Sequence, residues 1–366
     1  MNQPAISPRQ FMFIVIFFTI GSSILIVPSP IASAAKHDAW VSVLLSILVG
    51  ASLVLFYILV WKSLKGKSFV QACTFVFGAW LGRLFSFFYL AFLYILSALV
   101  LRNIGDFMTT SIIPETPLTF IHLFFLLVVI VGCYLGVESI GRSAEIFMPW
   151  MILLFLFLIF SISPQMNMDH LRPFFDSTSK EIIDGSTVMI GTPYLEMVAL
   201  LMVIPYVKES PKTAHGWFIG SMIGGGFLFL ITILSLLVLG SDLTSLNAYP
   251  TYNVAEKINI AGFMEGLEII IAIIWMITIF FKLTVLYYAS SVGIAQFLNI
   301  DNHRILLLPL GMGMIVLSLV AYPDMAYYEN FVADTWLPYA VTHGFLLPLF
   351  LWGGLQIKNR AQKNTL

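Results

Sequence analysis

The chain has 366 residues, of which 59% are apolar and only 10% are charged. Soluble domains do not have this composition, and apolar runs long enough to cross ~30 Å of hydrocarbon recur along the whole sequence. These runs are continuous rather than alternating, which excludes an outer-membrane β-barrel. The net charge of −1 gives no indication of nucleic-acid binding. The composition therefore predicts an all-α polytopic membrane protein.

Ten apolar runs are predicted to be membrane spans, joined by mostly short loops. They cover roughly residues 10–34, 39–61, 84–105, 118–136, 144–163, 183–206, 214–240, 264–298, 304–322 and 334–357. With the N-terminus inside, twelve Lys and Arg residues fall on the inner side of these spans, five fall on the outer side, and Lys282 lies within a span. Because Lys and Arg favour the cytosolic side, both termini are expected in the cytosol.

Two similar stretches interrupt the apolar pattern in the first and sixth spans. Residues 20–23 read IGSS and residues 190–193 read IGTP, and each stretch is followed by a further proline, Pro28 or Pro205. Segments five spans apart run in opposite directions through the membrane, as a five-plus-five inverted repeat requires. We therefore expect a LeuT-like fold with broken helices 1 and 6. Its two repeats would cover residues 10–163 and 183–357.

A helix broken inside lipid leaves backbone N–H and C=O groups without intrahelical partners, so the break is stable only where it faces protein, water or a ligand. The N–H groups near Ser23–Leu25 would suit a carboxylate, and the carbonyls of residues 18–21 and 188–191 would suit an ammonium group. A free amino acid carries both groups. The alternative is a pair of Gly/Pro kinks whose hydroxyls bond back to the helix.

Two charged residues are placed at membrane depth, where a central charge costs ~2.5–3.5 kcal/mol to insert. Glu196 follows the second break, and Lys282 lies well inside the eighth span. Glu196 would accept a proton or bind a ligand ammonium. Lys282 would place its own ammonium between spans one and eight, as an ion or coupling site. Alternatively, each charge pairs with another buried polar group and holds helices together.

Polar residues at helical spacing complete the candidate site. Thr284 and Tyr287 lie on one stripe of the eighth span, and Tyr94 lies on a polar face of the third; these faces would either line the cavity or hydrogen-bond between packed helices. Arg102 and Asp106 are four residues apart and are expected to form a local ion pair. The candidate ligand-binding residues are Gly21, Ser22, Ser23, Ile24, Tyr94, Gly191, Thr192, Glu196, Thr284 and Tyr287, and Lys282 is the candidate ion or coupling site.

Several stretches, in order along nearly the whole chain, resemble one family. They are GSSILIVP in span one, GTPYLEMVALLMVIPYV in span six, GVESIGRSAEIFMPW at 136–150, MDHLRPFFDSTSKEIIDGS at 168–186 and YPTYNVAEKINIAGFMEGLEIIIAIIWMITIFFKL at 249–283. The sequence is similar to the endospore germination permeases, which are the B-subunits of nutrient germinant receptors within the amino acid–polyamine–organocation transporter superfamily.

This resemblance implies a receptor subunit in the inner membrane of the spore. It would sense a small nutrient, usually an amino acid, and act with a second membrane subunit and a lipoprotein to trigger germination. The broken helices, Glu196 and Lys282 leave open a proton- or sodium-coupled amino-acid transporter. No metal-ligand spacing, phosphate-binding loop or nucleophile elbow occurs in the sequence. We therefore expect no enzyme activity, no catalytic residue, no metal and no cofactor.

Overall fold

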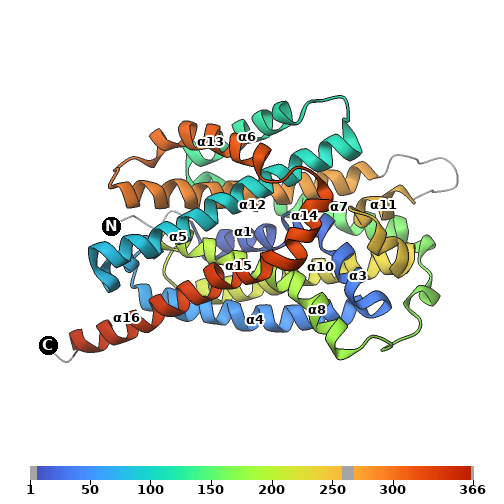
Figure 1. Cartoon of the computed structure of the whole chain (residues 1–366), viewed down its shortest axis with the longest axis horizontal. Coiled ribbons are helices and arrows are strands. Elements are labelled where there is room, and N and C mark those ends of the chain that lie inside the picture. The colour runs from blue at the N-terminus through green and yellow to red at the C-terminus, as the bar shows by residue number, and fades with distance from the viewer. Residues whose placement is uncertain (1–5, 258–267, 364–366) are drawn as a thin grey trace.

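The structure, a computed structural model, describes residues 6–257 and 268–363, with side chains through residue 360. It is a bundle of long helices whose axes run along the longest dimension of the molecule (Figure 1). The α-helices are α1 (Pro8–Ile20), α2 (Ser23–Ile26), α3 (Pro28–Ala35), α4 (Ala39–Leu64), α5 (Phe69–Phe107), α6 (Leu118–Leu135), α7 (Val137–Ile162), α8 (Ser179–Met189), α9 (Leu200–Val203), α10 (Pro211–Leu246), α11 (Pro250–Glu256), α12 (Glu268–Leu298), α13 (Leu307–Val320), α14 (Met325–Phe331), α15 (Leu337–Val341) and α16 (Leu347–Lys363).

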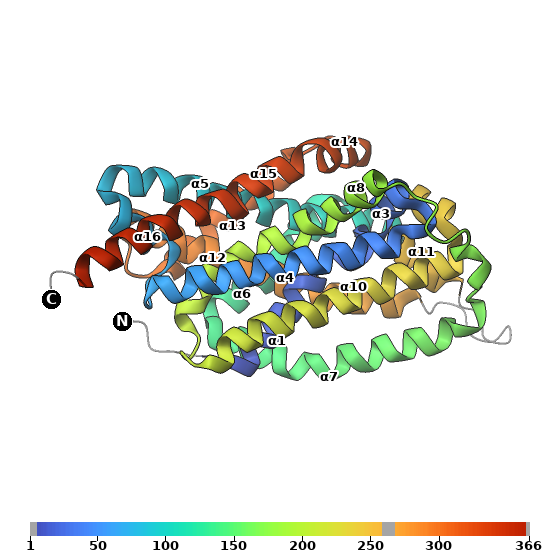
Figure 2. The same cartoon turned by 90° about the horizontal axis from the view of Figure 1, so that it is seen from below.

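Ten helical segments in the described part of the chain are long and apolar enough to cross a membrane, which confirms the predicted number. Strand pairing within the described residues is limited to one isolated parallel bridge between Ile6 and Val207. The start of α1 and the end of α16 lie at the same end of the bundle (Figure 2). We call this the terminal end, and an even number of spans requires the two ends of the chain to be together.

Several helices begin before the predicted spans. α5 begins at Phe69 rather than near 84, and α14 begins at Met325 rather than near 334. Ser68 caps α5 with Gln71 in a reciprocal capping box, and Asp324 caps α14 by accepting from the amide of Tyr327. Hydropathy locates the apolar centre of a span, whereas capping side chains determine where its helix begins. The predicted start of the eighth span, at 264, lies outside the described residues.

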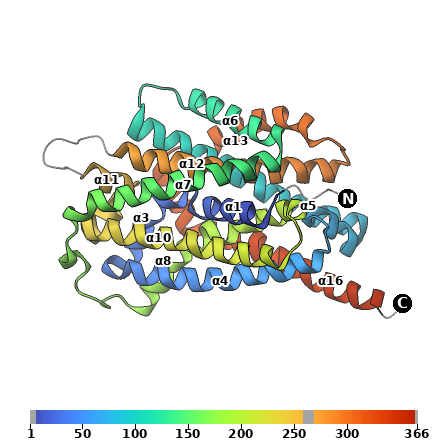
Figure 3. The same cartoon turned by 180° about the vertical axis from the view of Figure 1, so that it is seen from behind.

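Spans one, six and eight form the core of the bundle. Within their most apolar windows 72%, 78% and 72% of the residues are buried, compared with 28% and 22% for the spans built from α6 and α13. α1 lies in the middle of the bundle, next to α10 and α12, and α6 and α13 lie together at its edge (Figure 3). The polar breaks predicted for spans one and six therefore lie inside protein. The division into repeats at 10–163 and 183–357 stays a prediction.

Candidate functional site

The first break lies between α1 and α2, at Gly21. Its backbone has φ +26° and ψ −123°, a conformation that side chains with a Cβ rarely adopt. The Gly21 amide still closes α1 by donating to the Phe17 carbonyl at 2.8 Å, while its own carbonyl accepts from Thr278 Oγ1 at 3.2 Å. A Cβ at Gly21 would lie only 2.4 Å from Lys282 Cδ. Glycine is therefore required here by the backbone conformation and by the close approach of α12.

The second break follows α8 and is centred on Thr192. Thr192 has φ −135° and ψ 109°, the extended conformation that is favoured for a residue before proline. Its Oγ1 accepts a hydrogen bond from Trp336 Nε1 at 2.8 Å. The sequence predicted a break at Gly191, and the structure places the extended residue one position later because Pro193 constrains Thr192.

Lys282 and Glu196 meet between the two breaks. Lys282 Nζ lies 2.6 Å from Glu196 Oε2, and the two side chains are 0% and 2% exposed. The same ammonium donates to Ser22 Oγ at 2.8 Å and lies 5.8 Å from the centre of the Phe18 ring. A buried charge is stable when it is paired and hydrogen-bonded. α12 thus supplies a cation that connects the residue after the first break to the carboxylate that follows the second.

A small cavity lies against this ion pair. Its volume is about 20 Å³, which is room for about one water and far too little for an amino acid. Its walls are Ser22, Leu96, Leu99, Val100, Asn103, Thr192, Glu196, Tyr328, Phe331, Val332 and Trp336. Four of these residues lie between 328 and 336, so the segment that begins span ten closes one side of the cavity.

The structure brings together most of the candidate residues at the breaks. Ser22, Thr192 and Glu196 line the cavity, and Lys282 contacts both Ser22 and Glu196. Three further candidates, Gly191, Ser23 and Ile24, lie close to these residues in the chain. Gly191 faces the Trp336 ring, Ser23 is fully buried at the start of α2, and the Ile24 carbonyl accepts from Thr251 Oγ1 at 2.7 Å.

Tyr94, Thr284 and Tyr287 do not join this cluster. Tyr94 Oη donates to the Leu310 carbonyl at 2.6 Å, and Tyr287 Oη donates to the Leu307 carbonyl; both acceptors belong to α13. Thr284 Oγ1 bonds back to the Phe280 carbonyl of its own helix at 2.6 Å. In this structure the polar stripe of the eighth span makes hydrogen bonds within its own helix and to a packed neighbour, the second of the two arrangements that its spacing allows.

Four residues at the site were not found from the sequence: Asn103, Thr278, Tyr328 and Trp336. Thr278 lies one helical turn before Lys282 and therefore faces the same break, a spacing that could have identified it. Asn103, Tyr328 and Trp336 come from spans three and ten, and sequence spacing cannot show that these spans meet at the breaks.

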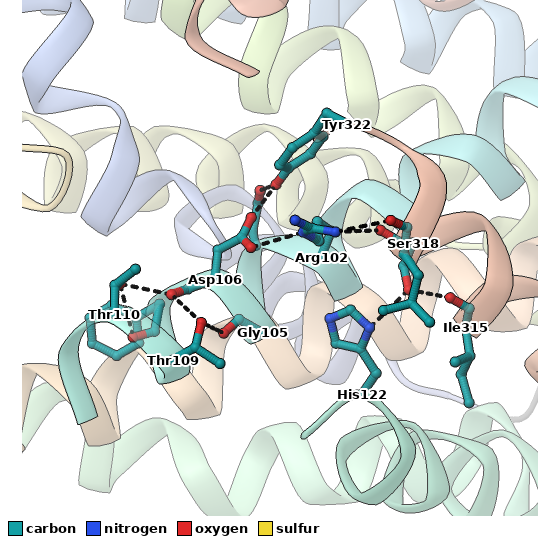
Figure 4. Close-up of polar contacts among 12 residues, drawn as sticks. Arg102, Gly105, Asp106, Thr109, Thr110, His122, Ile315, Ser318 and Tyr322 are labelled. Atoms are coloured by element: carbon teal, nitrogen blue, oxygen red, sulfur yellow. Dashed lines mark hydrogen bonds and ion pairs between the residues drawn. The ribbon is translucent and has the colours of Figure 1, made fainter. Parts of the chain in front are cut away.

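A second polar network lies between the cavity and the end of the bundle opposite the termini. The predicted Arg102–Asp106 pair is confirmed, with Arg102 Nε 2.8 Å from Asp106 Oδ1. Figure 4 shows Asp106 between Arg102 and Tyr322, whose phenol donates to Asp106 Oδ2 at 2.5 Å. Burial and the Asp106 carboxylate raise the pKa of Tyr322, so the phenol stays protonated and remains a donor. Arg102 Nη1 also donates to the Ser318 and Leu319 carbonyls, at 3.3 and 3.2 Å, near the end of α13.

Asn103 connects this network to the cavity. Its Oδ1 lies 3.4 Å from Tyr322 Oη, and its Nδ2 lies 3.5 Å from Tyr328 Oη. Arg102 and Asp106 in turn line a pocket of about 540 Å³ at the end opposite the termini. Polar groups of α5, α14 and the loop between α13 and α14 therefore lie in series from that pocket to the buried ion pair.

Comparisons with known proteins agree with this architecture. Residues 5–325 match the family described as spore germination protein. Spore germination protein KB of Bacillus subtilis strain 168 is 27% identical over 357 residues, which cover 96% of this chain and 95% of that protein. MhsT in complex with L-phenylalanine matches 97% of this chain and 99% of that chain, with 12% identity and a TM-score of 0.67.

A nucleobase–cation symport transporter, Mhp1 in a closed conformation with bromovinylhydantoin bound, shows the same fold. It matches 94% of this chain and 79% of that chain, with 12% identity and a TM-score of 0.60. The LeuT-like fold predicted from the broken helices is thereby confirmed. The chain is an integral membrane protein, and it belongs to the spore germination protein family, the endospore germination permeases.

Proposed function

We propose that this protein is the B-subunit of a spore nutrient germinant receptor, which binds a small nutrient at the broken helices and thereby triggers germination. The observation that carries the proposal is the buried cluster of Ser22, Glu196 and Lys282 between two interrupted helices. Interrupted helices in the core of a membrane protein expose backbone groups that a solute can use. The membership of the chain in the spore germination protein family supports germination as the output.

An amino acid is the nutrient that fits the charges best. Glu196 and Lys282 neutralise each other, so the site as a whole favours a ligand that carries one charge of each sign. The ligand ammonium would replace Lys282 at Glu196, and the ligand carboxylate would take the released Lys282 ammonium and the N–H groups near Ser23. The fold of MhsT, which was solved in complex with L-phenylalanine, supports this ligand class.

Binding requires the site to open. Because the cavity holds about one water, the segment from Tyr328 to Trp336 would have to move away from Thr192 before a nutrient could enter. The bound nutrient would then stabilise a different arrangement of span ten, and this change is the signal that we propose the receptor passes on.

Two measurements test the proposal. Purified protein screened against common amino acids and sugars should show a thermal shift with an amino acid, and Glu196→Gln should lose it while Lys212→Gln, an exposed substitution far from the cavity, keeps it. Spores lacking the gene should fail to germinate with that nutrient while their nutrient uptake is unaltered. Normal nutrient-triggered germination, with no redundant receptor present, would reject the receptor function.

The assembly and location are part of the same proposal. We infer a location in the inner membrane of the spore, with both termini cytosolic, and association with a second membrane subunit and a lipoprotein. Family resemblance and the charge bias of the loops support this arrangement. Co-purification of the two other subunits with the tagged chain from spore membranes tests it, and recovery of the chain alone would contradict it.

A proton- or sodium-coupled amino-acid transporter is the second candidate. It is favoured by the position of the Lys282 ammonium, which α12 holds against Ser22 of span one, where related transporters hold a coupling sodium. The neighbouring structures are transporters rather than enzymes, and the family is permease-like, so we propose no catalytic activity. Uptake of radiolabelled amino acid into proteoliposomes separates the two functions. No flux above empty vesicles, under either ion gradient, would reject transport.

A further inference from the structure

Two lysines converge on one aromatic ring at the terminal end of the bundle. Lys67 Nζ, from the loop before α5, lies 4.7 Å from the centre of the Phe75 ring, and Lys358 Nζ, from α16, lies 4.6 Å from the same centre. Lys358 Nζ also donates to the Phe75 carbonyl. The attraction between an ammonium and an aromatic face explains each contact singly, but two like charges around one ring repel each other.

The surrounding residues add positive charge. Lys62 and Lys65 lie at the end of α4 and just beyond it, and Arg360 lies two residues after Lys358; with Lys67 and Lys358 they form what we call the basic corner. Within the described part of the chain, none of the ion pairs includes a residue of the basic corner.

The helices that carry the basic corner are packed closely against one another. Gln356 and Asn359 of α16 both donate to Ser63 at the end of α4, through Nε2 at 3.1 Å and Nδ2 at 3.4 Å. Gly354 packs so closely on α5 that a Cβ would lie 2.3 Å from Val76 Cγ1. A pocket of about 550 Å³ adjoins the corner, lined by Lys65, Lys67, Ser68 and one carboxylate, Glu209, among others.

An apolar surface adjoins the corner on the same two helices. On α5, Trp80 is 92% exposed, and Leu81 and Leu84 are 56% and 50% exposed; on α16, Phe350 and Ile357 are 57% and 74% exposed. The Phe85 and Phe350 rings lie edge to face where the two helices meet, with their centres 6.5 Å apart. A tryptophan at the edge of a lipid-facing surface is typical of the level at which lipid headgroups lie.

We propose that the basic corner is a binding site for an anionic phospholipid, whose phosphate lies between Lys67 and Lys358 and whose acyl chains follow the exposed faces of α5 and α16. Each ammonium has three N–H donors, and Lys358 uses one of them on Phe75, so both lysines keep donors for phosphate oxygens. A basic cluster at a membrane surface recognises anionic lipid. The apolar surface beside the cluster matches a lipid better than a soluble anion or an acidic protein segment.

The test is native mass spectrometry of the full chain in detergent, with phosphatidylglycerol or phosphatidylcholine added at equal concentration. The wild-type protein should retain phosphatidylglycerol preferentially. The double variant Lys67→Gln/Lys358→Gln should lose this preference by about 30-fold, the order expected for two surface lysines. Lys67→Arg/Lys358→Arg, which keeps both charges, should retain it.

A matched control distinguishes a site from general surface charge. Lys212→Gln, the control for Lys67→Gln, removes an exposed lysine that lies outside the basic corner and does not line the adjoining pocket, and it should leave the preference unchanged. An equal loss in this control, or full retention in the Lys67/Lys358 double variant, would overturn the site. Displacement of the lipid by millimolar inorganic phosphate would overturn the lipid assignment in favour of a soluble anion. If the double variant does not fold, Lys67→Gln alone can be tested. This variant is expected to fold, because the Lys67 side chain makes no hydrogen bond to the described residues, and it should still reduce the preference for phosphatidylglycerol.

Discussion

The two helix breaks have similar sequences but are held by different neighbours. At the first break α12 presses directly on Gly21, and a Cβ there would lie 2.4 Å from Lys282 Cδ. At the second, a Cβ on Gly191 would lie 3.2 Å from Trp336 Cδ1, a contact that a small shift of the ring relieves. The first break therefore depends on glycine and on a buried cation. The second depends on Thr192 before Pro193 and on an aromatic side chain of span ten.

Both breaks nevertheless rest on neighbouring glycines of α10. A Cβ on Gly224 would lie 2.5 Å from Thr19 Cβ, just before the first break, and a Cβ on Gly225 would lie 2.4 Å from Tyr194 Oη, just after the second. One turn of α10 thus fixes the position of both interrupted helices. The other side of the second break is formed by Trp336 and Tyr328 of span ten, which line the cavity.

The largest effect is expected from breaking the ion pair that joins the two breaks. Lys282→Met leaves Glu196 as an uncompensated buried charge, so we expect a loss of about 3–5 kcal/mol in the free energy of unfolding. Lys282→Met combined with Glu196→Gln should recover most of that loss, because no net charge then remains buried. Unfolding by denaturing detergent, followed by circular dichroism, measures both. Equal stability of the single variant and the wild type would show that the pair does not hold the breaks together.

Alanine at the two glycines tests whether the breaks differ as their contacts indicate. Gly21→Ala has to relieve both an unfavourable φ and the contact with Lys282, and we expect it to destabilise by about 2–4 kcal/mol. Gly191→Ala should change stability by less than about 1 kcal/mol, since only the edge of the Trp336 ring must shift. The same unfolding assay gives both values. Similar losses in the two variants would mean that the second break is as tightly packed as the first.

The contrast between the breaks also explains which residues of the site can be identified from the sequence. Gly21, Ser22 and Thr192 were singled out because a Gly-Ser or Gly-Thr-Pro step inside an apolar run is a local signal, and Glu196 and Lys282 because a charge at membrane depth is rare. Trp336 and Asn103 carry no such local signal, since their roles come from how spans three and ten pack against the breaks. Tyr94 and Tyr287 show the converse: helical spacing defines a polar face without showing which neighbour it meets.

The shared support on α10 can be tested with two adjacent glycines. The Tyr194 ring is held between Gly225 and Gly50, whose Cβ would lie 2.5 Å from the ring, so Gly225→Ala cannot be relieved by moving the ring and should cost about 1–3 kcal/mol. Gly226→Ala is the matched control, because a Cβ there meets nothing within 4 Å and alanine favours the helix. Thermal unfolding in detergent should place Gly225→Ala below the wild type and Gly226→Ala at or slightly above it. The reverse order would contradict the packing of α10 against the second break.

A smaller effect than that of Gly225→Ala is expected from the hydrogen bond that closes the second break. Trp336→Phe keeps an aromatic ring against Gly191 but removes the donor to Thr192 Oγ1, a loss of about 1 kcal/mol. If span ten must leave Thr192 for a nutrient to enter, the variant should open more readily. The dose–response of germination should then shift to lower nutrient concentration, although the protein is slightly less stable. An unchanged dose–response alongside the stability loss would show that this hydrogen bond supports the fold without controlling access, and the difference between the two breaks would then be one of packing alone.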